Sequence, residues 1–269
     1  MTSDLSVIIP TFRRPVELVE AITRVLAEQQ IRLEVIVVDD SPEGSARNAV
    51  ASIADSRVRY LNSERPSGGK PALVRNQGWP HATGRFVQFL DDDDLPDVGA
   101  YTAMIGALEA NSGKGVVFGR VEPFGNDPHE LQLQEAYFNN ATKRARFSNR
   151  FGLRWLITAN MLFMDSLLVN SACMLRRECI EPLGGYDVDC ELNEDADFYL
   201  RAIRRFGCVY LNRVVVHYRT CAPSLMHDRV GSDPLSRAYR HIHRKYRAEH
   251  GAIEYMSLKL FARAALRWL

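Results

Sequence analysis

Hydrophobic residues in this chain follow two alternating patterns, short continuous runs and helical spacing, over most of its length. Residues 5–10 form an apolar run that is rich in β-branched side chains and ends at a proline, whereas residues 15–29 repeat apolar positions every three or four residues. The first pattern predicts a buried strand and the second predicts an amphipathic helix. By the same criteria we expect strands at residues 33–38, 58–61, 86–90, 115–118, 169–175 and 208–218. We expect further helices at residues 46–54, 72–79, 100–110 and 196–206.

The order of these elements predicts the fold class. Continuous apolar strands separated by helices are typical of a mostly parallel sheet that is covered on both faces and connected by right-handed crossovers. We therefore expect an α/β protein with the architecture of an α/β/α sandwich. Residues 122–165 show no clear periodicity, and we expect a variable, partly helical region there.

Polar residues gather directly after three of the expected strands. Residues 11–14 (Thr-Phe-Arg-Arg) follow the first strand, residues 39–40 (Asp-Asp) follow the second, and residues 91–94, all aspartate, follow the fourth. Ligands of open α/β sheets bind at the carboxyl ends of the strands, where these residues belong. The dinucleotide fingerprint Gly-x-Gly-x-x-Gly does not follow the first strand, and the phosphate-binding pattern Gly-x-x-x-x-Gly-Lys-Ser/Thr occurs nowhere in the sequence.

The four aspartates at residues 91–94 indicate a divalent cation site. Two carboxylates about 4 Å apart repel each other by about 4 kcal/mol at an effective dielectric constant of about 20. A bound cation removes this repulsion, and Mg²⁺ and Mn²⁺ favour such oxygen-rich sites. The alternative is that Asp94 or Asp97 caps the helix after Pro96, which accounts for one or two aspartates but not for four.

Asp39, Asp40 and Arg75 have both structural and functional interpretations. The two aspartates either stabilise a turn or accept hydrogen bonds from a nucleobase or a ribose. Arg75 is expected on a helix that follows a Gly-Gly turn. Its guanidinium there either pairs with a phosphate, neutralises the aspartates, or forms an ordinary internal salt bridge.

Glu194, Asp195 and His217 also allow two interpretations. The two acidic residues precede a helix, where negative side chains gain about 0.3–1 kcal/mol from the helix dipole. A carboxylate held there by the Gly-Gly-Tyr-Asp turn at residues 184–187 is also placed to deprotonate an acceptor hydroxyl as a general base. His217 is a lone histidine in an expected strand, and such a residue is commonly part of a satisfied core.

The composition excludes several classes of protein. Of the 269 residues, 46% are apolar, 25% charged and 9% aromatic, which is typical of a globular protein and not of a disordered, collagenous or membrane-spanning one. No apolar run approaches the roughly 20 residues of a membrane helix, and the N-terminus lacks the pattern of a signal peptide. The five cysteines form no Cys-x-x-Cys pair, so we expect neither a disulfide framework nor a zinc site. A reducing, cytoplasmic location fits best.

Charge is distributed unevenly along the chain. The net charge is +1, but residues 235–269 carry eight Lys or Arg against two Glu, which leaves residues 1–234 acidic. An acidic main body lacks the broad basic surface of a nucleic-acid-binding protein, so we expect no nucleic-acid partner. The basic C-terminal segment either makes peripheral contact with anionic lipid at the inner face of the membrane or forms the solvated face of terminal helices.

Four segments resemble, in order, the motifs of the inverting GT-A-fold glycosyltransferases known as glycosyltransferase family 2. Residues 6–15 (SVIIPTFRRP) resemble the opening strand and loop of this family, and residues 37–44 (VVDDSPEG) resemble its nucleoside-recognition segment. Residues 89–97 (FLDDDDLPD) resemble its Asp-x-Asp metal motif, and residues 184–207 (GGYDVDCELNEDADFYLRAIRRFG) resemble the segment that carries the catalytic base. The resemblance covers about residues 5–220, and four collinear motifs are far more specific than any one of them.

The resemblance implies roles for individual residues. The residues that it places at the nucleotide sugar are Pro10, Thr11, Arg13, Asp39, Asp40, Arg75, Asp91 and Asp92. Asp93, Asp91 and His217 are the implied ligands of Mn²⁺ or Mg²⁺, with Asp93 foremost. Asp195 is the implied catalytic base, with Glu194 beside it.

The resemblance also implies how the chain is divided. Residues 1–220 correspond to a GT-A catalytic domain and residues 221–269 to a basic helical extension. Within the catalytic domain, about residues 1–120 form the nucleotide-sugar half, and about residues 121–220 form the acceptor half with the catalytic base.

The implied activity is a metal-dependent single displacement that inverts the anomeric carbon. The donor is a UDP-, dTDP- or GDP-sugar, and the acceptor is a sugar, a lipid-linked molecule or a small molecule in polysaccharide, glycolipid or glycosylated natural-product biosynthesis. Processive relatives carry Gln-x-x-Arg-Trp, but here Ala264 stands where the Gln would be, so we expect a single addition. The alternatives are a nucleotidyltransferase, although a Gly-rich, Lys-containing loop is missing after the first strand, and a non-catalytic metal- or carbohydrate-binding module.

Overall fold

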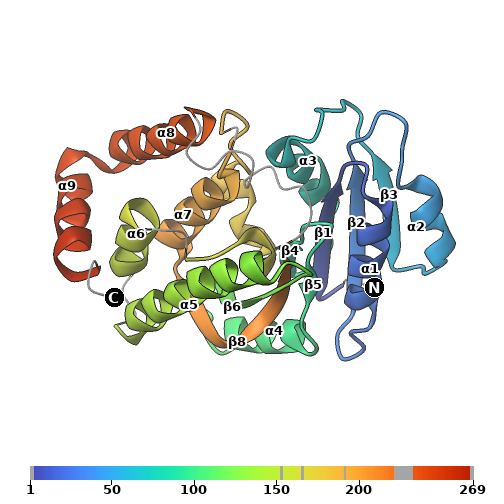
Figure 1. Cartoon of the computed structure of the whole chain (residues 1–269), viewed down its shortest axis with the longest axis horizontal. Helices are drawn as coiled ribbons and strands as arrows, with labels where there is room; N and C mark the ends of the chain where they lie inside the picture. The colour runs from blue at the N-terminus through green and yellow to red at the C-terminus, as the bar shows by residue number, and fades with distance from the viewer. Residues whose placement is uncertain (1–2, 152–153, 165–166, 191, 221–232, 267–269) are drawn as a thin grey trace.

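A single sheet forms the centre of the protein. The structure is a computed structural model that describes residues 3–151, 154–164, 167–190, 192–220 and 233–266. Its strands are β1 (Leu5–Thr11), β2 (Leu33–Asp39), β3 (Val58–Asn62), β4 (Phe86–Phe89), β5 (Leu95–Pro96), β6 (Val116–Phe124), β7 (Cys173–Arg176) and β8 (Cys208–Arg219). They lie in the order β3-β2-β1-β4-β7-β6-β8-β5 (Figure 1). The strands from β3 to β4 in this order are parallel, β7 is antiparallel to both of its neighbours, and β8 is parallel to β6. The prediction of a mostly parallel sheet is confirmed.

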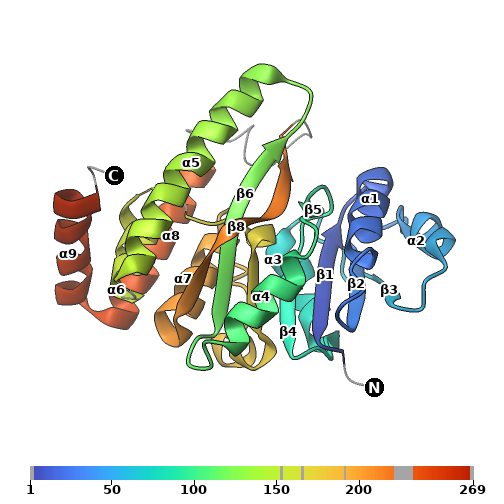
Figure 2. The ribbon, with the colours of Figure 1, turned by 90° about the horizontal axis from the view of Figure 1, so that it is seen from below.

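Helices cover both faces of this sheet, as the α/β/α prediction requires. They are α1 (Pro15–Leu26), α2 (Arg47–Ile53), α3 (Pro71–Gly78), α4 (Ala100–Glu109), α5 (Pro128–Arg150), α6 (Arg154–Phe163), α7 (Glu194–Phe206), α8 (Asp233–His250) and α9 (Ala252–Phe261). One buried cluster joins the sheet to α1 and α4, and a second joins the opposite face to α3, α6 and α7. In Figure 2, α1 lies beside β1 and β2, against which its buried residues pack.

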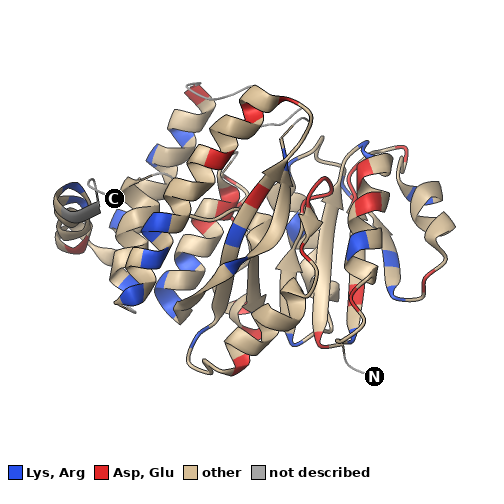
Figure 3. Cartoon of the chain, turned by 60° about the horizontal axis from the view of Figure 1, so that its bottom comes forward, with Lys and Arg blue, Asp and Glu red and all other residues tan. Residues whose placement is uncertain are grey.

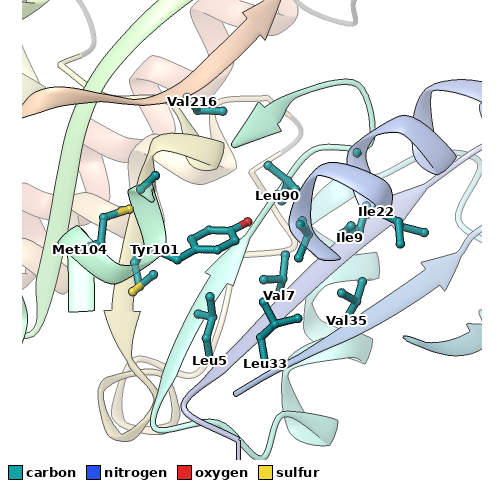
Figure 4. Packing of buried hydrophobic residues seen from close by; sticks show 14 of the residues in the cluster. Leu5, Val7, Ile9, Ile22, Leu33, Val35, Leu90, Tyr101, Met104 and Val216 are labelled. Atoms are coloured by element: carbon teal, nitrogen blue, oxygen red, sulfur yellow. The ribbon is translucent and has the colours of Figure 1, made fainter. Parts of the chain in front are cut away.

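The continuous apolar run of β1 is explained by burial on both faces. Leu5, Val7 and Ile9 belong to the cluster with α1 and α4, whereas Ile8 belongs to the cluster on the opposite face. Figure 4 shows this first cluster, in which the side chains of β1 and β2 meet Ile22 of α1 and the residues of α4. A strand with two buried faces needs no polar alternation, which is why its sequence shows none.

The region at residues 122–165 is more regular than the sequence indicates. β6 extends to Phe124, and most of the remaining residues form the 23-residue helix α5 and the helix α6. α5 begins with a clear signal, because the Asp127 carboxylate accepts hydrogen bonds from the backbone N–H groups of His129 and Glu130 and a proline occupies the first position. Its apolar pattern is weak because the buried positions include Arg144 and Ser148.

The strand expected at residues 169–175 is wrong in its first half. Residues Asn170–Ala172 form a 3₁₀ turn, and β7 begins only at Cys173. The turn is stabilised by the buried amide of Asn170, which donates to the carbonyl of Phe89 at 2.9 Å and to the carboxylate of Asp91 at 3.2 Å. The two-residue strand β5 was not expected, since two residues carry no periodicity.

The helices α8 and α9 pack against the main body through a third buried cluster. Ile242 of α8 and Leu258 of α9 meet Leu162 of α6 and Leu200 of α7 there. Asp187, in the turn before α7, also accepts hydrogen bonds from Lys245 at 2.6 Å and from the His241 ring at 3.0 Å. Among the described helices, none combines the length and the hydropathy that a bilayer crossing requires.

Asp187 should make the attachment of α8 sensitive to acid. Burial opposes ionisation of this carboxyl, but the hydrogen bonds from Lys245 and His241 outweigh burial and hold its pKa well below the ordinary value. A depressed folded-state pKa contributes stability above the unfolded-state pKa, about 4, and this contribution is lost as the pH falls through the folded value. Asp187→Asn should therefore lower the free energy of unfolding at neutral pH by about 1.5–3 kcal/mol, and the difference should shrink below about pH 4.

Urea unfolding at several pH values measures this difference. The matched control is Asp189→Asn, because the side chain of Asp189 is exposed in the same turn. A loss of stability in Asp187→Asn that does not depend on pH would contradict the assigned role of the ionised carboxylate.

Candidate active site

Acidic and basic side chains meet at the carboxyl ends of β1, β2 and β4. Thr11 at the end of β1 lies opposite Asp39 at the end of β2, and the backbone N–H of Leu90 after β4 donates to the carbonyl of Ile8. The loop of residues 91–94 continues from this point and is visible in Figure 3 as a run of consecutive acidic residues near the centre of the molecule. The structure thus brings together the segments that the sequence places after three different strands.

Thr11 and Arg14 hold the first part of this acidic loop. The Thr11 hydroxyl donates to Asp92 Oδ2 at 2.7 Å, and the Arg14 guanidinium donates to Asp93 Oδ2 at 2.6 Å and to Asp92 Oδ1 at 3.4 Å. Burial together with the negative charge of Asp93 raises the pKa of Asp92 to about 7, although Thr11 and Arg14 oppose this shift. One guanidinium is therefore not enough to neutralise both carboxylates.

Asp94 is the most deeply buried member of the loop. It is 1% exposed, and its Oδ1 accepts a hydrogen bond from the backbone N–H of Arg219 on β8. Its Oδ2 has no hydrogen-bond partner among the described residues. Burial and the charges of Asp93 and Asp91 raise the pKa of this carboxyl well above its ordinary value, and burial likewise raises the pKa of Asp93. The loop holds more negative charge than the surrounding protein neutralises.

Arg75 joins the acidic loop to the second half of the chain. Its guanidinium is 3% exposed and donates to Asp91 at 2.7 Å and to Glu194 at 2.5 Å. The same group lies 5.2 Å from the ring centroid of Tyr186, which packs against it. Burial opposes the charge of Arg75, but Asp91 and Glu194 raise its pKa well above the ordinary value. A permanent positive charge thus lies between two carboxylates from distant parts of the sequence.

A glycine turn positions Tyr186 and the start of α7. Gly185 has a φ of +74°, and a Cβ at this position would lie 2.4 Å from Asn76 Oδ1. The Asn76 side chain accepts from the backbone N–H of Tyr186 and donates to its carbonyl, both at 2.8 Å. This close approach requires glycine and fixes the turn against α3, next to Arg75.

Glu194 and Asp195 begin α7 and differ in their surroundings. Glu194 is bound to Arg75, whereas Asp195 is half-buried, and its one hydrogen bond among the described residues comes from the backbone N–H of Ala196. Burial and the neighbouring charge of Glu194 raise the pKa of Asp195 to about 7, although Arg75 opposes this shift. Of the two carboxylates, Asp195 therefore has an oxygen available to accept a proton near neutral pH.

Asp39 and Asp40 are both fully buried and bonded to the protein. Asp39 accepts four hydrogen bonds, two from Ser41, one from the backbone of Ala46 and one from the Tyr60 hydroxyl. Asp40 accepts three, from the backbone and hydroxyl of Ser67 and from the backbone of Gly69. A carboxylate offers about four acceptor positions, so Asp39 is saturated, whereas Asp40 keeps one position on Oδ1.

The structure places two neighbouring arginines differently. Arg13 has a φ of +58° and forms an exposed pair with Glu43, whereas Arg14 reaches Asp92 and Asp93. The place of Arg13 beside the nucleotide stays a prediction, and the sequence analysis did not select Arg14. The two consecutive arginines were the available signal for a cation near the acidic loop. The left-handed backbone at Arg13 turns one side chain outward and the other inward, and the sequence does not reveal that backbone conformation. Pro10 lies half-buried in β1, next to Thr11.

The structure does not bring His217 together with Asp91 and Asp93. Its Nε2 lies 3.1 Å from Asp97 and its Nδ1 lies 3.3 Å from Glu122, so both ring nitrogens face other carboxylates. Tyr218, the next residue of β8, lies toward the acidic loop instead. Burial and the charges of Asp94 and Asp93 raise the pKa of its hydroxyl well above the ordinary value, so this hydroxyl keeps its proton. Successive side chains of a strand point to opposite faces, so only one of His217 and Tyr218 can face the acidic loop. This alternation was the available signal.

The carboxylates of this loop fit a divalent cation held in an open site. Within the described ranges, no three His, Cys, Asp or Glu side chains converge on one point as they would in a closed metal cage. Mg²⁺ is commonly bound by one or two carboxylates together with substrate phosphates, and Mn²⁺ accepts the same oxygen ligands. Asp91 and Asp93, in a loop with excess negative charge and the orphaned Oδ2 of Asp94, suit that arrangement.

Comparisons with known proteins agree on one kind of protein. The model of the family described as "Glycosyl transferase family 2" matches residues 6–170. A segment of 126 residues, 45% of this chain, is 37% identical to the GalNAc(5)-diNAcBac-PP-undecaprenol beta-1,3-glucosyltransferase of Campylobacter jejuni, of which it covers 40%. The chain thus spans less than half of the length of the first curated relatives that it matches.

Solved structures with low sequence identity share the fold. Residues 1–349 of TarS from S. aureus, in complex with UDP-GlcNAc, align with a TM-score of 0.66 at 16% identity, over 91% of this chain and 66% of that one. The mannosyltransferase PcManGT from Pyrobaculum calidifontis, in complex with GDP-Man and Mn²⁺, aligns with a TM-score of 0.58 at 18% identity, over 100% of this chain and 81% of that one. These similarities establish the GT-A type of α/β fold.

The assignment of Arg14 to the acidic loop can be tested by stability. Arg14→Gln should lower the free energy of unfolding by about 1–3 kcal/mol at about pH 8, because Asp92 and Asp93 then lose their nearest positive charge. The matched control, Arg13→Gln, removes an exposed pair and should change stability by less than about 1 kcal/mol. Urea unfolding in the presence of a chelator measures both. Equal losses in the two variants would contradict the assignment of Arg14 to the acidic loop.

Proposed function

Because this chain belongs to glycosyl transferase family 2, a family of glycosyltransferases that act on nucleotide sugars, we propose that it is a metal-dependent inverting enzyme that transfers one sugar to an acceptor hydroxyl. The observation that carries this proposal is the pairing across Arg75. It joins Asp91, one of the proposed cation ligands, to Glu194, the neighbour of the proposed base Asp195. This pairing supports a donor site and a base at one edge of the sheet.

Asp195 is the proposed catalytic base. It takes the proton of the acceptor hydroxyl, whose oxygen forms a bond to the anomeric carbon from the face opposite the nucleoside diphosphate. The bond between the anomeric carbon and the diphosphate oxygen breaks with its electron pair on that oxygen, so the anomeric configuration inverts. Glu194 keeps Arg75 in place and, through its own charge, helps to raise the pKa of Asp195 toward neutral pH.

Asp93 and Asp91 are the proposed ligands of Mn²⁺ or Mg²⁺. Such a cation, when bound, neutralises charge on the departing diphosphate. Asp92 is held by Thr11 and Arg14 and orients the loop from which the two ligands project. Cations of the protein also contact this loop: Arg14, which follows β1, pairs with Asp93, and Arg75 of α3 pairs with Asp91.

Asp40 is the member of the Asp39–Asp40 pair that we place at the nucleobase. Its Oδ1 retains an acceptor position, whereas all four acceptor positions of Asp39 are used inside the protein. Pro10 and Thr11 border the same edge, and Arg13 lies on its solvent side. UDP, dTDP and GDP are the proposed nucleotides, and the UDP-GlcNAc and GDP-Man complexes of the structural neighbours support this range.

The acceptor is proposed to be a sugar, a lipid-linked molecule or a small molecule in polysaccharide, glycolipid or glycosylated natural-product biosynthesis. The Campylobacter jejuni relative is named for a diphosphoundecaprenol-linked acceptor, which supports the lipid-linked choice. Residues 1–120 would form the donor half and residues 121–220 the acceptor half, because Asp195 and Tyr218 come from the second segment. The proposed location is the cytoplasm or the inner face of its membrane.

Replacement of the base should abolish turnover and spare donor binding. Asp195→Asn should lower kcat/KM by about 10²–10⁴ while diphosphate affinity stays within about threefold. The matched control, Asp189→Asn, should retain activity. Release of nucleoside diphosphate from UDP-, dTDP- and GDP-sugars, with a panel of acceptors, is the measurement. For the unaltered protein, the rate should rise with pH through about 7, where Asp195 loses its proton. Full activity of Asp195→Asn would contradict the proposed base.

Thermal unfolding should identify the nucleotide. A ligand at about 100 times its Kd stabilises the folded state by about 2.7 kcal/mol, so one of UDP, dTDP and GDP should raise the Tm in a Mn²⁺-dependent manner. Asp93→Asn should remove the Mn²⁺-dependent part of this rise, and Asp97→Asn, the control in the neighbouring loop, should keep it. A rise that is independent of Mn²⁺ in all three proteins would contradict the metal assignment.

A further inference from the structure

The outer face of α9 exposes large apolar side chains in a regular pattern. Ile253 is 86% exposed, Met256 49% and Leu260 61%. Intervals of three and four residues place these side chains on one face of a helix. We call these three residues the α9 ridge. Single exposed hydrophobic residues are normal in proteins, but an aligned row of them indicates an interaction surface.

The ridge is not the face by which α9 packs on the protein. Leu258 and Ala262 are the buried residues of this segment, and Tyr255 and Phe261 pack with them against the cluster shared with α6. α9 is therefore apolar on two sides, one turned toward the protein and one away from it. In Figures 1 and 2, α9 lies at one end of the molecule, with α6 and α8 on its inner side.

Basic residues lie beside the α9 ridge. Arg240, Arg244 and Arg247 are exposed at intervals of four and three along one face of α8. Arg244 and Arg247 line a hollow of about 460 Å³ at the junction of the two helices, together with Ala252 and Tyr255 of α9. The arginine row therefore reaches the junction of α8 and α9, at the end of α9 where the ridge begins with Ile253.

The positive charge of this surface is not balanced locally. Between residues 233 and 264 there are seven Lys or Arg and three Asp or Glu. Of the seven, Lys245 is bound to Asp187 and Asp197 of the main body. Of the acidic residues, Glu254 is bound to Arg204 of α7, which turns its charge toward the protein. Lys259 adds positive charge on α9 itself, and Arg263 adds more directly after it.

We propose that the α9 ridge and the arginine row of α8 dock on an anionic lipid bilayer. Apolar side chains on one face of a helix, flanked by Lys and Arg, are the combination that binds at a lipid interface: the apolar groups insert at the level of the headgroups and the cations contact lipid phosphates. The helix would lie on the membrane and not cross it, in accord with the absence of a bilayer-spanning helix among the described residues.

The charges favour lipid over a second copy of the chain. A symmetric dimer through the α9 ridge would place the arginine row of one copy near that of the other, because a twofold interface uses the same surface on both sides. Like charges across an interface oppose association, whereas anionic headgroups complement the arginines. This surface is independent of the proposed transfer reaction, because lipid binding needs neither donor nor acceptor.

The experiment is co-sedimentation of the full chain with vesicles. Vesicles of phosphatidylcholine with phosphatidylglycerol should bind at least about tenfold more protein than vesicles of phosphatidylcholine alone, and high salt should reduce this binding because it screens exposed charges. Equal binding to both vesicle types, or no binding to either, would overturn the proposal. Diphosphate-dependent Tm shifts of the same sample report on the donor site separately, so failure of one proposal is distinguishable from failure of the other.

Variants test the two parts of the surface. Ile253→Ser with Leu260→Ser should reduce binding to the phosphatidylglycerol vesicles by about tenfold or more, and Arg244→Gln with Arg247→Gln should remove most of the preference for anionic lipid. The control for the ridge is Val16→Ser with Val98→Ser, which removes side chains that are 77% and 73% exposed elsewhere. The control for the charges is Arg65→Gln with Lys70→Gln.

Two results with these variants would overturn the proposal. One is that the ridge variant binds vesicles to the same extent as its control variant does. The other is a concentration-dependent dimer of the unaltered chain that the ridge variant lacks, which would assign the surface to a second copy. Because the altered side chains are exposed, the variants should keep the Tm of the unaltered protein, and this measurement accompanies each binding result.

Discussion

The position of a single buried guanidinium, that of Arg75, is the constraint on which the rest of the site depends. Ionised groups persist in a protein interior only where an opposite charge and hydrogen bonds replace water. Arg75 does this for Asp91 and Glu194 at the same time, so the loop after β4 and the first turn of α7 must both reach α3. The glycine turn with Asn76 and the packed ring of Tyr186 lie at that convergence. The charge of Glu194 there helps burial to raise the pKa of Asp195, although Arg75 opposes this shift.

The acidic edge of the sheet was predictable from the sequence because its physical causes are local. Strands buried on both faces leave a continuous apolar run, and in a parallel sheet the residues after such runs meet at one edge. β1, β2 and β4 and the groups that follow them, including Asp91 to Asp94, were found in this way. Arg75 and Asp195 were selected instead from the Gly-Gly turns that precede their helices. Residue chemistry alone left open a nucleotidyltransferase and a non-catalytic binding module. Family membership decides for a glycosyltransferase.

Features that depend on backbone conformation or on distant partners were not predictable. Arg14, and not Arg13, contacts the acidic loop because the backbone at Arg13 is left-handed. Tyr218, and not His217, lies toward that loop because of the register of β8 against β5 and β6. The turn at Asn170 replaces a strand because a buried amide bonds Phe89 and Asp91, which the local sequence does not reveal. α5 was expected only as part of a variable, partly helical region, because polar residues such as Arg144 occupy part of its buried face.

The bridge made by Arg75 also limits how this architecture can be recombined. If the segment before residue 120 were exchanged for that of a homologue without the equivalent arginine, Glu194 would remain buried with no cation to neutralise it. If only the later segment were exchanged, Arg75 would keep Asp91 and lose its second partner. The two segments are therefore physically matched, and a hybrid chain must carry Arg75 and Glu194 together, along with the Asn76–Gly185 contact that fixes the turn before α7 against α3.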